Sequence, residues 1–263
     1  MLKHYSIFCF FLFLCAYAQG QDVWLHPNDG QWDDRIEYKL DIDYGEILIE
    51  KDKFTYYLND SKITEHQHTE EEHTSDSVKF HTITSTFLGS NWNNSKSEEN
   101  ISSFYRNYIL GNDQSKWKSK VYSYSDVRMH ELYEGVELRL NTENGGLNYS
   151  FEIRPGVNPD VIQRQFDGQK SIEIDEDGNL RIQNRFGEII ESAPIAWNLI
   201  DGKRKMVRVN FKIENNTVAF DFPKGYDQNQ ILIIDPSITF SSFTGSTADN
   251  WGMSATPDTD GNL

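Results

Sequence analysis

The feature of this sequence that most restricts its fold is a two-residue alternation of apolar and polar side chains, which recurs through most of the chain from Asp22 onward. Side chains alternate between the two faces of a β-strand, so this period indicates strands with one buried face and not amphipathic helices. The segments that show it most clearly are residues 47–50, 54–58, 78–88, 147–153, 171–175 and 179–183.

Short turn sequences join these segments. Asp177-Gly178 separates two of them, Asp201-Gly202 separates residues 195–200 from 206–213, and Asn215-Asn216 turns the chain into the next strand. Such pairs readily form tight hairpin loops. Residues 231–235 are continuously apolar up to Asp235, which is typical of a buried strand. Successive hairpins predict an all-β fold, specifically an antiparallel, β-sandwich-like domain.

Two polar stretches interrupt the pattern, residues 59–77 and 89–103, and both are predicted to be long loops. They leave open a division of the chain into two subdomains. Helical character is confined to residues 125–133, where we expect at most one helical turn.

The N-terminus has the parts of a secretory signal peptide. Lys3 supplies positive charge, about twelve apolar residues follow, and Ala16 and Ala18 form a small-residue cleavage site. Because a bilayer-spanning helix needs about 20 apolar residues, the run is too short for an uncleaved anchor. Lipidation at Cys15 is a further alternative. We predict a signal peptide over residues 1–18 and no transmembrane segment in the mature chain.

Cysteine content and charge narrow the compartment and the partners. Cys9 and Cys15 both lie in the predicted signal peptide, so the mature chain has no cysteine, which favours a Gram-negative surface protein over a secreted eukaryotic domain. The chain has 25 Lys+Arg against 41 Asp+Glu, a net charge of −16. This charge argues against nucleic acid as a partner. We therefore predict a secreted protein, extracellular or on the outer cell surface.

The common catalytic motifs are missing from the sequence. It contains no G-x-S-x-G elbow, phosphate loop or dinucleotide loop. His130-Glu131 opens a zinc-protease-like motif, but Glu134 stands where the second histidine is needed. A glycosidase uses a pair of carboxylates, and no pair can be singled out among the 41 acids. We predict no catalytic residue and no cofactor.

His66, His68 and His73 are the best metal-ligand candidates, with Glu65 and residues 70–72 beside them. In an extended segment His66 and His68 would project from one face and could share a zinc or nickel ion. A third ligand at a defined spacing is missing, so we interpret the cluster as a solvated loop and predict no metal site.

Two acidic motifs and the tryptophans are further candidates for binding ligands. Residues 175–178 and 258–261 resemble fragments of calcium loops but do not continue to the distal glutamate, so we interpret both as β-turns. Tryptophans could form a sugar-stacking face, although most such rings in β proteins belong to the core. The six tryptophans are Trp24, Trp32, Trp92, Trp117, Trp197 and Trp251.

Several segments, taken in order, resemble one family, the uncharacterised N-terminal domain that precedes SBBP-type β-propeller repeats in large bacterial surface proteins. Residues 239–252 resemble the opening of such a repeat, with Ser246 in place of its usual second glycine, and residues 258–262 resemble its turn. The segments that carry the resemblance are residues 28–31, 105–113, 121–124, 132–138, 149–156, 166–168 and 234–236.

The signal-peptide pattern and the resemblance together imply three parts: the signal peptide at residues 1–18, an N-terminal all-β domain at 19–236, and a truncated first propeller-type repeat at 237–263. Relatives of this kind are commonly exported through type IX secretion and are linked to gliding and adhesion. The leading hypothesis is a non-catalytic structural or adhesive module whose partners are surface polysaccharide or other cell-surface proteins. The alternative is an extracellular glycan hydrolase that uses a carboxylate pair.

Overall fold

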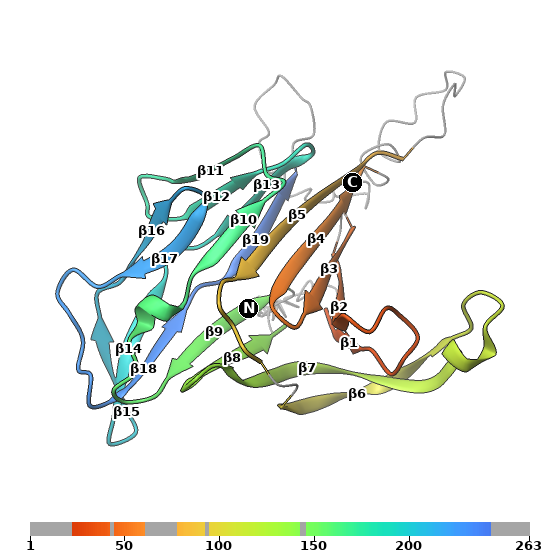
Figure 1. Ribbon diagram of the computed structural model, residues 1–263, viewed down its shortest axis with the longest axis horizontal. Coiled ribbons are helices and arrows are strands. Elements are labelled where there is room, and N and C mark those ends of the chain that lie inside the picture. The colour runs from red at the N-terminus through yellow and green to blue at the C-terminus, as the bar shows by residue number, and fades with distance from the viewer. Residues whose placement is uncertain (1–22, 43–44, 61–77, 93–94, 143–145, 243–263) are drawn as a thin grey trace, which may run out of the picture.

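The computed structural model describes residues 23–42, 45–60, 78–92, 95–142 and 146–242. These residues are almost entirely β-strands, which confirms the predicted all-β class (Figure 1). In this part of the chain the helical elements are two short 3-10 helices, η1 (Gln114–Lys116) and η3 (Pro159–Val161). The described part contains no helix long and apolar enough to cross a membrane.

Most of the strands belong to one antiparallel sheet of fifteen strands, in the order β15-β14-β18-β9-β8-β7-β1-β2-β3-β4-β5-β10-β17-β16, with β6 paired to β7. Its strands are β1 (Leu25–Pro27), β2 (Ile36–Ile42), β3 (Gly45–Glu50), β4 (Lys53–Asn59), β5 (Phe80–Phe87), β6 (Lys96–Tyr108), β7 (Lys118–Tyr133), β8 (Val136–Asn141), β9 (Asn148–Ile153), β10 (Arg164–Asp167), β14 (Ile195–Ile200), β15 (Lys203–Val207), β16 (Asn210–Glu214), β17 (Thr217–Asp221) and β18 (Ile231–Asp235).

A smaller antiparallel sheet has the order β11-β12-β13-β19. Its strands are β11 (Ser171–Ile174), β12 (Leu180–Gln183), β13 (Gly187–Glu191) and β19 (Ile238–Ser242). Strand β19 begins beyond residue 236 and pairs with β13 along its whole length. The described chain past that residue is thus part of the small sheet, and residues 243–263 lie outside the described residues.

The predicted hairpins are confirmed, and their turn residues have the required backbone. Asp201 and Gly202 have φ angles of 50° and 73°, and Asn215 and Asn216 have φ angles of 48° and 62°, as two-residue loops of this type need. The β11–β12 turn instead places positive φ on Gly178 alone, at 85°. Residues 175–178 form this turn, as predicted.

Three local predictions were wrong. Residues 96–103 lie in β6 and not in a loop. Within the described chain β6 pairs with β7 alone, so most of its side chains face solvent and the strand needs no alternation of apolar and polar residues. Residues 125–133 lie in β7 and not in a helical turn, since Glu131 at φ 56° marks a bulge that disrupts the two-residue period. Residues 206–213 belong to two strands, β15 and β16, because they pair at opposite ends of the long sheet.

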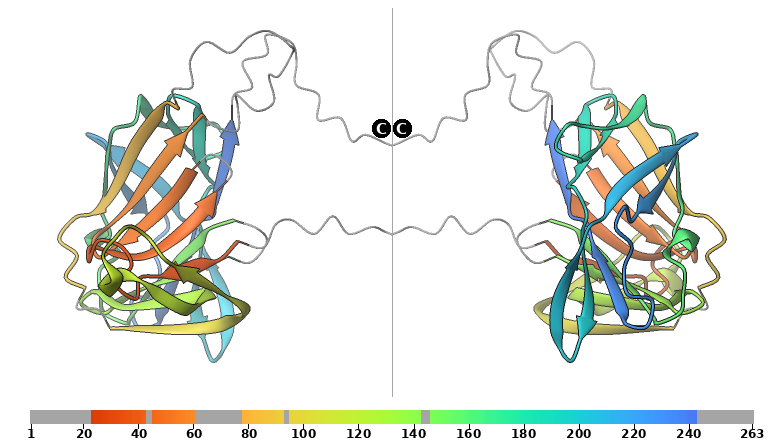
Figure 2. Two further views of the ribbon diagram at one scale, coloured as in Figure 1. Left: turned by 90° about the vertical axis from the view of Figure 1, so that its right-hand side faces the viewer. Right: turned by 90° about the vertical axis from the view of Figure 1, so that its left-hand side faces the viewer.

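The long sheet curls around a single core. Its two terminal strands, β15 and β16, are separated by two residues, so the ends of the sheet lie near one another (Figure 2). Rings from strands far apart in the sheet order therefore meet inside. Phe151 on β9 lies 6.1 Å from Phe87 on β5 and 5.9 Å from Phe220 on β17. The edge-to-face contacts of these rings stabilise the curled arrangement.

A buried ion pair joins the two sheets. Arg164 on β10 donates two hydrogen bonds of 2.8 Å to the carboxylate of Glu191 on β13 and one of 2.9 Å to Ser85. The hydroxyl of Tyr149 on β9 donates to the same carboxylate at 2.6 Å. The Arg164 guanidinium lies 5.0 Å from the centres of the Tyr149 and Phe166 rings. Two strands of the long sheet, β9 and β10, thus bond one carboxylate of the small sheet, and Ser85 on β5 holds Arg164 in place.

Candidate functional site

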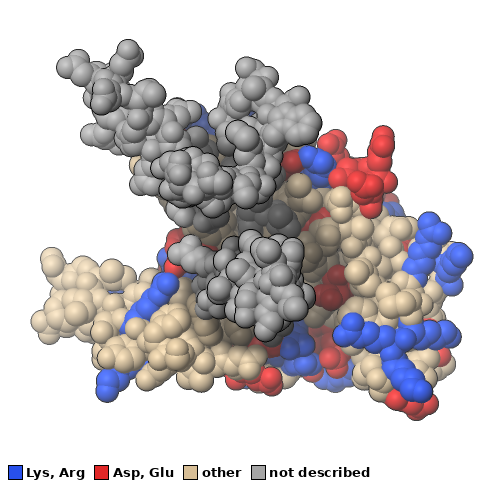
Figure 3. Space-filling model, turned by 180° about the vertical axis from the view of Figure 1, so that it is seen from behind, with Lys and Arg blue, Asp and Glu red and all other residues tan. Residues whose placement is uncertain are grey.

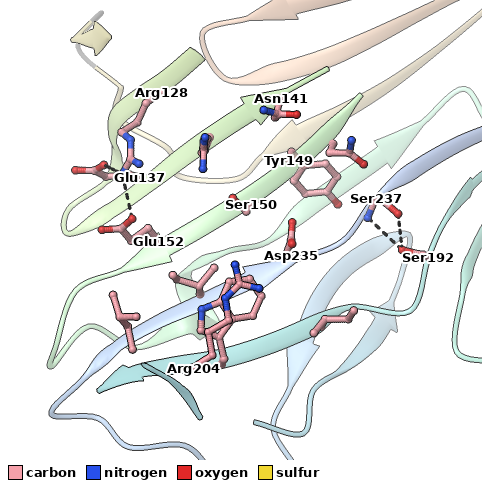
Figure 4. A pocket seen from close by; sticks show the side chains of 16 residues that line it. Arg128, Glu137, Asn141, Tyr149, Ser150, Glu152, Ser192, Arg204, Asp235 and Ser237 are labelled. Atoms are coloured by element: carbon pink, nitrogen blue, oxygen red, sulfur yellow. Dashed lines mark hydrogen bonds and ion pairs between the residues drawn. The ribbon is translucent and has the colours of Figure 1, made fainter. Parts of the chain in front are cut away.

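The candidate site is a groove of about 540 Å³ on the outer surface of the long sheet, across β8, β9, β18 and β14 (Figure 4). Residues that alternate with its lining, such as Leu138, Phe151 and Ile234, are buried in the core. The lining therefore occupies the opposite face of the same strands. Its polar side chains are Arg128, Glu137, Arg139, Asn141, Asn148, Ser150, Glu152, Ser192, Arg204, Asp235 and Ser237.

Strand register places these side chains in rows. Arg139 on β8 pairs with Ser150 on β9, and Asp235 on β18 pairs with Ile195 on β14. The register of β9 with β18 continues the row, with Ser150 opposite Asp235. Directly opposed residues of antiparallel strands have Cβ atoms about 5 Å apart on one face. One row of side chains thus runs from the guanidinium of Arg139 through the hydroxyl of Ser150 to the carboxylate of Asp235 and the aliphatic side chain of Ile195.

A second row carries paired charges. Arg128 on β7 donates to Glu137 at 2.9 Å and to Glu152 at 3.0 Å, so one guanidinium serves carboxylates on two neighbouring strands (Figure 4). Burial alone would raise the pKa of Glu137, but hydrogen bonds from Arg128 and His130 outweigh it and lower this pKa. Glu137 is therefore held as a carboxylate that accepts hydrogen bonds.

A third charged pair stands at the β7 side of the groove. Arg139 donates through Nε to both carboxylate oxygens of Asp126, at 3.0 and 2.9 Å, and its Nη2 also bonds this carboxylate. Asn141 adds a hydrogen bond of 3.3 Å to the same group. Asp126 is 4% exposed, so this pair is firmly held at the edge of the groove.

Asp235 differs from the other groove carboxylates. Burial between the walls of the groove raises its pKa, against opposing effects of Arg204 and Arg139. Among the described residues no side chain donates a hydrogen bond to it. Its carboxyl is directed into the groove near Tyr149 and Ser150 (Figure 4). This is the groove acid whose hydrogen-bonding capacity is open to a ligand.

The β14 side of the groove carries apolar side chains, and the largest of them, Trp197, is covered by Arg204. Trp197 is 7% exposed because the Arg204 guanidinium lies 4.3 Å from the centre of its ring. Ile195, at 53% exposed, provides an open apolar contact beside Asp235. The groove as a whole offers carboxylate, guanidinium, amide and hydroxyl groups with one aliphatic patch, a set that suits a polar, uncharged or weakly charged ligand.

A second constellation combines serine, histidine and aspartate. Ser123 Oγ lies 2.6 Å from His26 Nδ1, and His26 Nε2 lies 3.6 Å from Asp41, which also accepts a 2.9 Å hydrogen bond from Arg106. His26, and then Arg106, lower the pKa of Asp41. These residue types resemble a nucleophilic triad, but Ser123 is 1% exposed and His26 is 2% exposed. A substrate cannot reach the buried hydroxyl, so this chain of contacts anchors β7 and β6 to β1 and β2.

The histidines singled out from the sequence do not form a metal or catalytic site among the described residues. His66, His68 and His73 lie outside the described residues, and within the described ranges no three metal-ligand side chains come together. His130 lies on strand β7 and not on a catalytic helix. Its side chain contacts Ser97 and Glu137.

The tryptophans do not form one sugar-stacking face. Trp92 and Trp197 are buried, at 8% and 7% exposed, and Trp251 lies outside the described residues. Trp24 packs against Phe104 and Trp32 against Tyr108, and the exposed Trp117 also lies near the far end of the β6–β7 hairpin.

The sequence contained only part of the information needed to find the groove. Glu137, Arg139 and Asn141 alternate with apolar residues on β8, which predicts that they face outward together. Some of their partners are near in the sequence, such as Asn148, 7 positions after Asn141, but Asp235 lies 96 positions after Arg139. No local pattern says which strands become neighbours.

The fold and the groove together define an all-β domain with a polar groove on one face of its long sheet. The chain belongs to the family described as a domain of unknown function, DUF7948, whose model matches residues 25–237. No curated protein and no solved structure matches the chain.

Proposed function

We propose that this protein is a non-catalytic structural or adhesive module of a secreted bacterial surface protein, and that its groove binds a polysaccharide segment of a cell surface. The observation that carries the proposal is the row from Arg139 through Ser150 to Asp235, which presents donors and acceptors along a rigid sheet face. Hydroxyl-rich ligands are bound by such groups.

The pairing of the other charges supports a binding role. Arg128 is engaged by Glu137 and Glu152, and Arg139 by Asp126, before any ligand arrives. These ion pairs fix the side chains in position, so a ligand meets a preorganised surface and less side-chain entropy is lost on binding.

The wider setting rests on the sequence. The N-terminal signal-peptide pattern supports export, and the resemblance to domains that precede SBBP-type repeats supports a place at the outer surface of a Gram-negative bacterium, with links to type IX secretion, gliding and adhesion. In the same proposal the curled sheet is a sandwich-like domain that precedes propeller repeats.

A second candidate function, glycan hydrolysis, is favoured by one observation. Asp235 has a raised pKa, as a general acid requires, and Glu152 on the neighbouring strand β9 accepts a hydrogen bond from Arg128. The two residues are diagonal neighbours on β18 and β9, on the same outer face of the sheet. A glycosidase that inverts needs two such carboxyl groups on opposite sides of the bond it cleaves.

The test compares Asp235→Asn with Arg139→Gln and with Asp167→Asn, a control at an exposed aspartate on β10 outside the groove. Binding to a panel of neutral, amino and acidic polysaccharides is measured by calorimetry, and release of reducing ends is measured on the same panel. We expect binding that Arg139→Gln and Asp235→Asn weaken and the control leaves unchanged, with no release of reducing ends.

Two results contradict the binding module. Release of reducing ends that Asp235→Asn abolishes assigns the groove to hydrolysis. Binding that neither groove variant alters moves the ligand elsewhere on the molecule.

A further inference from the structure

The outer half of the β6–β7 hairpin, residues 101–122, forms an arm that extends away from the body at one end of the molecule (Figure 1). Its large apolar side chains are unusually exposed: Ile101 58%, Tyr105 48%, Ile109 67%, Leu110 50%, Trp117 39% and Tyr122 37%. A monomer seldom exposes so many large apolar residues on one element, and such patches mark interaction surfaces.

The arm is ordered by its own contacts. The rings of Tyr105 and Tyr122 pack across the two strands at 5.8 Å, and Asn107 accepts a 3.0 Å hydrogen bond from the Lys120 amide. Arg106 ties the arm to Asp41 of the body at 2.9 Å. The exposed apolar side chains are therefore held in place, not carried by an unstructured loop.

The charge of the arm is opposite to that of the chain. The arm contains four basic residues, Arg106, Lys116, Lys118 and Lys120, and one acid, Asp113, whereas the whole chain has 25 basic and 41 acidic residues. No ion pair engages its three lysines among the described residues. A basic and apolar surface on a chain of net charge −16 is complementary to other parts of the same protein.

The complementary surface lies at the other end of the molecule. The turn and edge strand of the β11–β12 hairpin expose Glu173, Glu176 and Asp177, with Ile174 37% exposed beside them. Figure 1 shows β11 and the arm at opposite ends, and Figure 3 shows acidic side chains gathered at the β11 end.

We propose that the arm of one copy docks on the β11–β12 hairpin of a second copy, so that copies associate head to tail. Exposed Ile109 and Leu110 fit an apolar protein contact better than a polysaccharide, which offers hydroxyl groups. Because donor and acceptor surfaces differ and lie at opposite ends, the contact is heterologous, and each added copy presents a free surface to the next.

The arm also overcomes the repulsion between two acidic bodies. Phe104, Arg106 and Tyr108 of the arm contact the body, and the tip at residues 109–117 projects beyond these contacts (Figure 1). Charges are screened over about 8 Å at physiological ionic strength. The arm can therefore contact a second copy while the two bodies remain apart, and added salt weakens the attraction at the contact itself.

The test is analytical ultracentrifugation of the purified protein over a range of concentrations, with two charge-reversed variants. One variant carries Lys116→Glu and Lys120→Glu on the arm, and the other carries Glu176→Lys and Asp177→Lys on the hairpin. We expect the wild type to associate with increasing concentration and each variant to weaken association by at least about tenfold, because like charges meet at the contact. Lys203→Glu with Lys205→Glu on exposed β15 is the matched control and leaves association unchanged.

Mixing the two variants gives the decisive result. The reversed arm of the first is complementary to the reversed hairpin of the second, and their remaining native surfaces also match, so the mixture regains association that neither variant shows alone. This recovery also shows that both variants are folded. A wild type that stays monomeric, or a mixture that does not recover, overturns the proposal. Retention of the monomeric wild type on acidic polysaccharide or on anionic vesicles, lost with the arm variant, assigns the arm to that other partner instead.

Discussion

Two arginine–glutamate clusters use the same chemistry in opposite surroundings. Arg164 and Glu191 have side chains 1% and 0% exposed and bond at 2.8 Å between the two sheets. Arg128 has a side chain 32% exposed and bonds Glu137 and Glu152 at 2.9 and 3.0 Å in the groove. The hydrogen bonds have nearly equal lengths, so the difference between the clusters is their access to water.

That difference separates the structural role of the buried cluster from the binding role proposed for the groove. A buried ion pair must recover a large desolvation cost, and Arg164 does so by bonding Glu191 and Ser85 while Tyr149 bonds the same carboxylate. The cluster thus specifies how the small sheet docks on the long one. The groove pairs remain partly hydrated, so their charges cost little to hold and stay available to a ligand.

Arg164→Met is expected to have the largest effect, because it leaves the Glu191 carboxylate buried without its counter-ion. The free energy of unfolding should fall by about 3–5 kcal/mol in urea titrations. Arg128→Met is the matched control in the groove and should cost about 1 kcal/mol or less. Equal losses in the two variants would show that burial does not distinguish the clusters.

The double variant Arg164→Met with Glu191→Leu sharpens this comparison. Replacing both charges removes the unpaired carboxylate, so the double variant should be more stable than Arg164→Met alone, since apolar replacement of a whole buried pair is often neutral. If the double variant instead loses the sum of the unfolding free energies lost by Arg164→Met and by Glu191→Leu, the pair acts through packing and not through its charge.

Tyr149→Phe tests the same cluster with a smaller change. The ring and its packing against Phe54 and Phe151 remain, but the hydroxyl that donates to Glu191 at 2.6 Å is removed. The cost is expected to be about 1–3 kcal/mol in the free energy of unfolding. Tyr57→Phe, at an exposed tyrosine on β4, is the control and should be close to neutral. A neutral Tyr149→Phe would indicate that Arg164 alone satisfies the carboxylate.

The sequence predicted the regular parts of this fold because local chemistry determines them. Asp201-Gly202 and Asn215-Asn216 adopt positive φ at low cost, and the apolar residues of 231–235 require a central strand. It failed at β6, where an edge strand exposed to water needs no apolar period, and at Glu131, where a bulge shifts the alternation.

The candidate site was beyond sequence reasoning for a different reason. Alternation on β8 predicts that Glu137 faces outward, but nothing local shows that Arg164 and Glu191 are buried while Arg128 lines the groove. All four lie on strands, and charged residues are usually exposed. Their environments follow from which strands pair and how the sheets dock, which are long-range properties of the fold.

Arg128→Gln should lower stability at neutral pH and leave stability in acid unchanged, so its effect is measured best as a function of pH. The pKa of Glu137 is lowered in the folded protein, so its contribution is present above its unfolded pKa and is lost as the pH falls through the folded pKa. Unfolding in urea at a series of pH values should show wild type and variant converging below about pH 4, the ordinary range of glutamate. A constant difference down to the most acidic point would mean that Arg128 acts through its aliphatic stem instead.

Asp235→Asn should have the smallest effect on stability and the opposite sign. The pKa of Asp235 is raised in the folded protein, so its ionised form opposes folding at neutral pH, and this opposition disappears as the pH falls through the folded pKa. We expect the variant to be slightly more stable at pH 7, by up to about 0.5 kcal/mol, and equal to wild type in acid. A carboxylate that costs stability, and that no described side chain satisfies, is a group that a ligand would engage. Calorimetry of the same variant that showed gained stability together with weaker polysaccharide binding would place Asp235 in the recognition surface, whereas a loss of stability at neutral pH would make it part of the structural charge network after all.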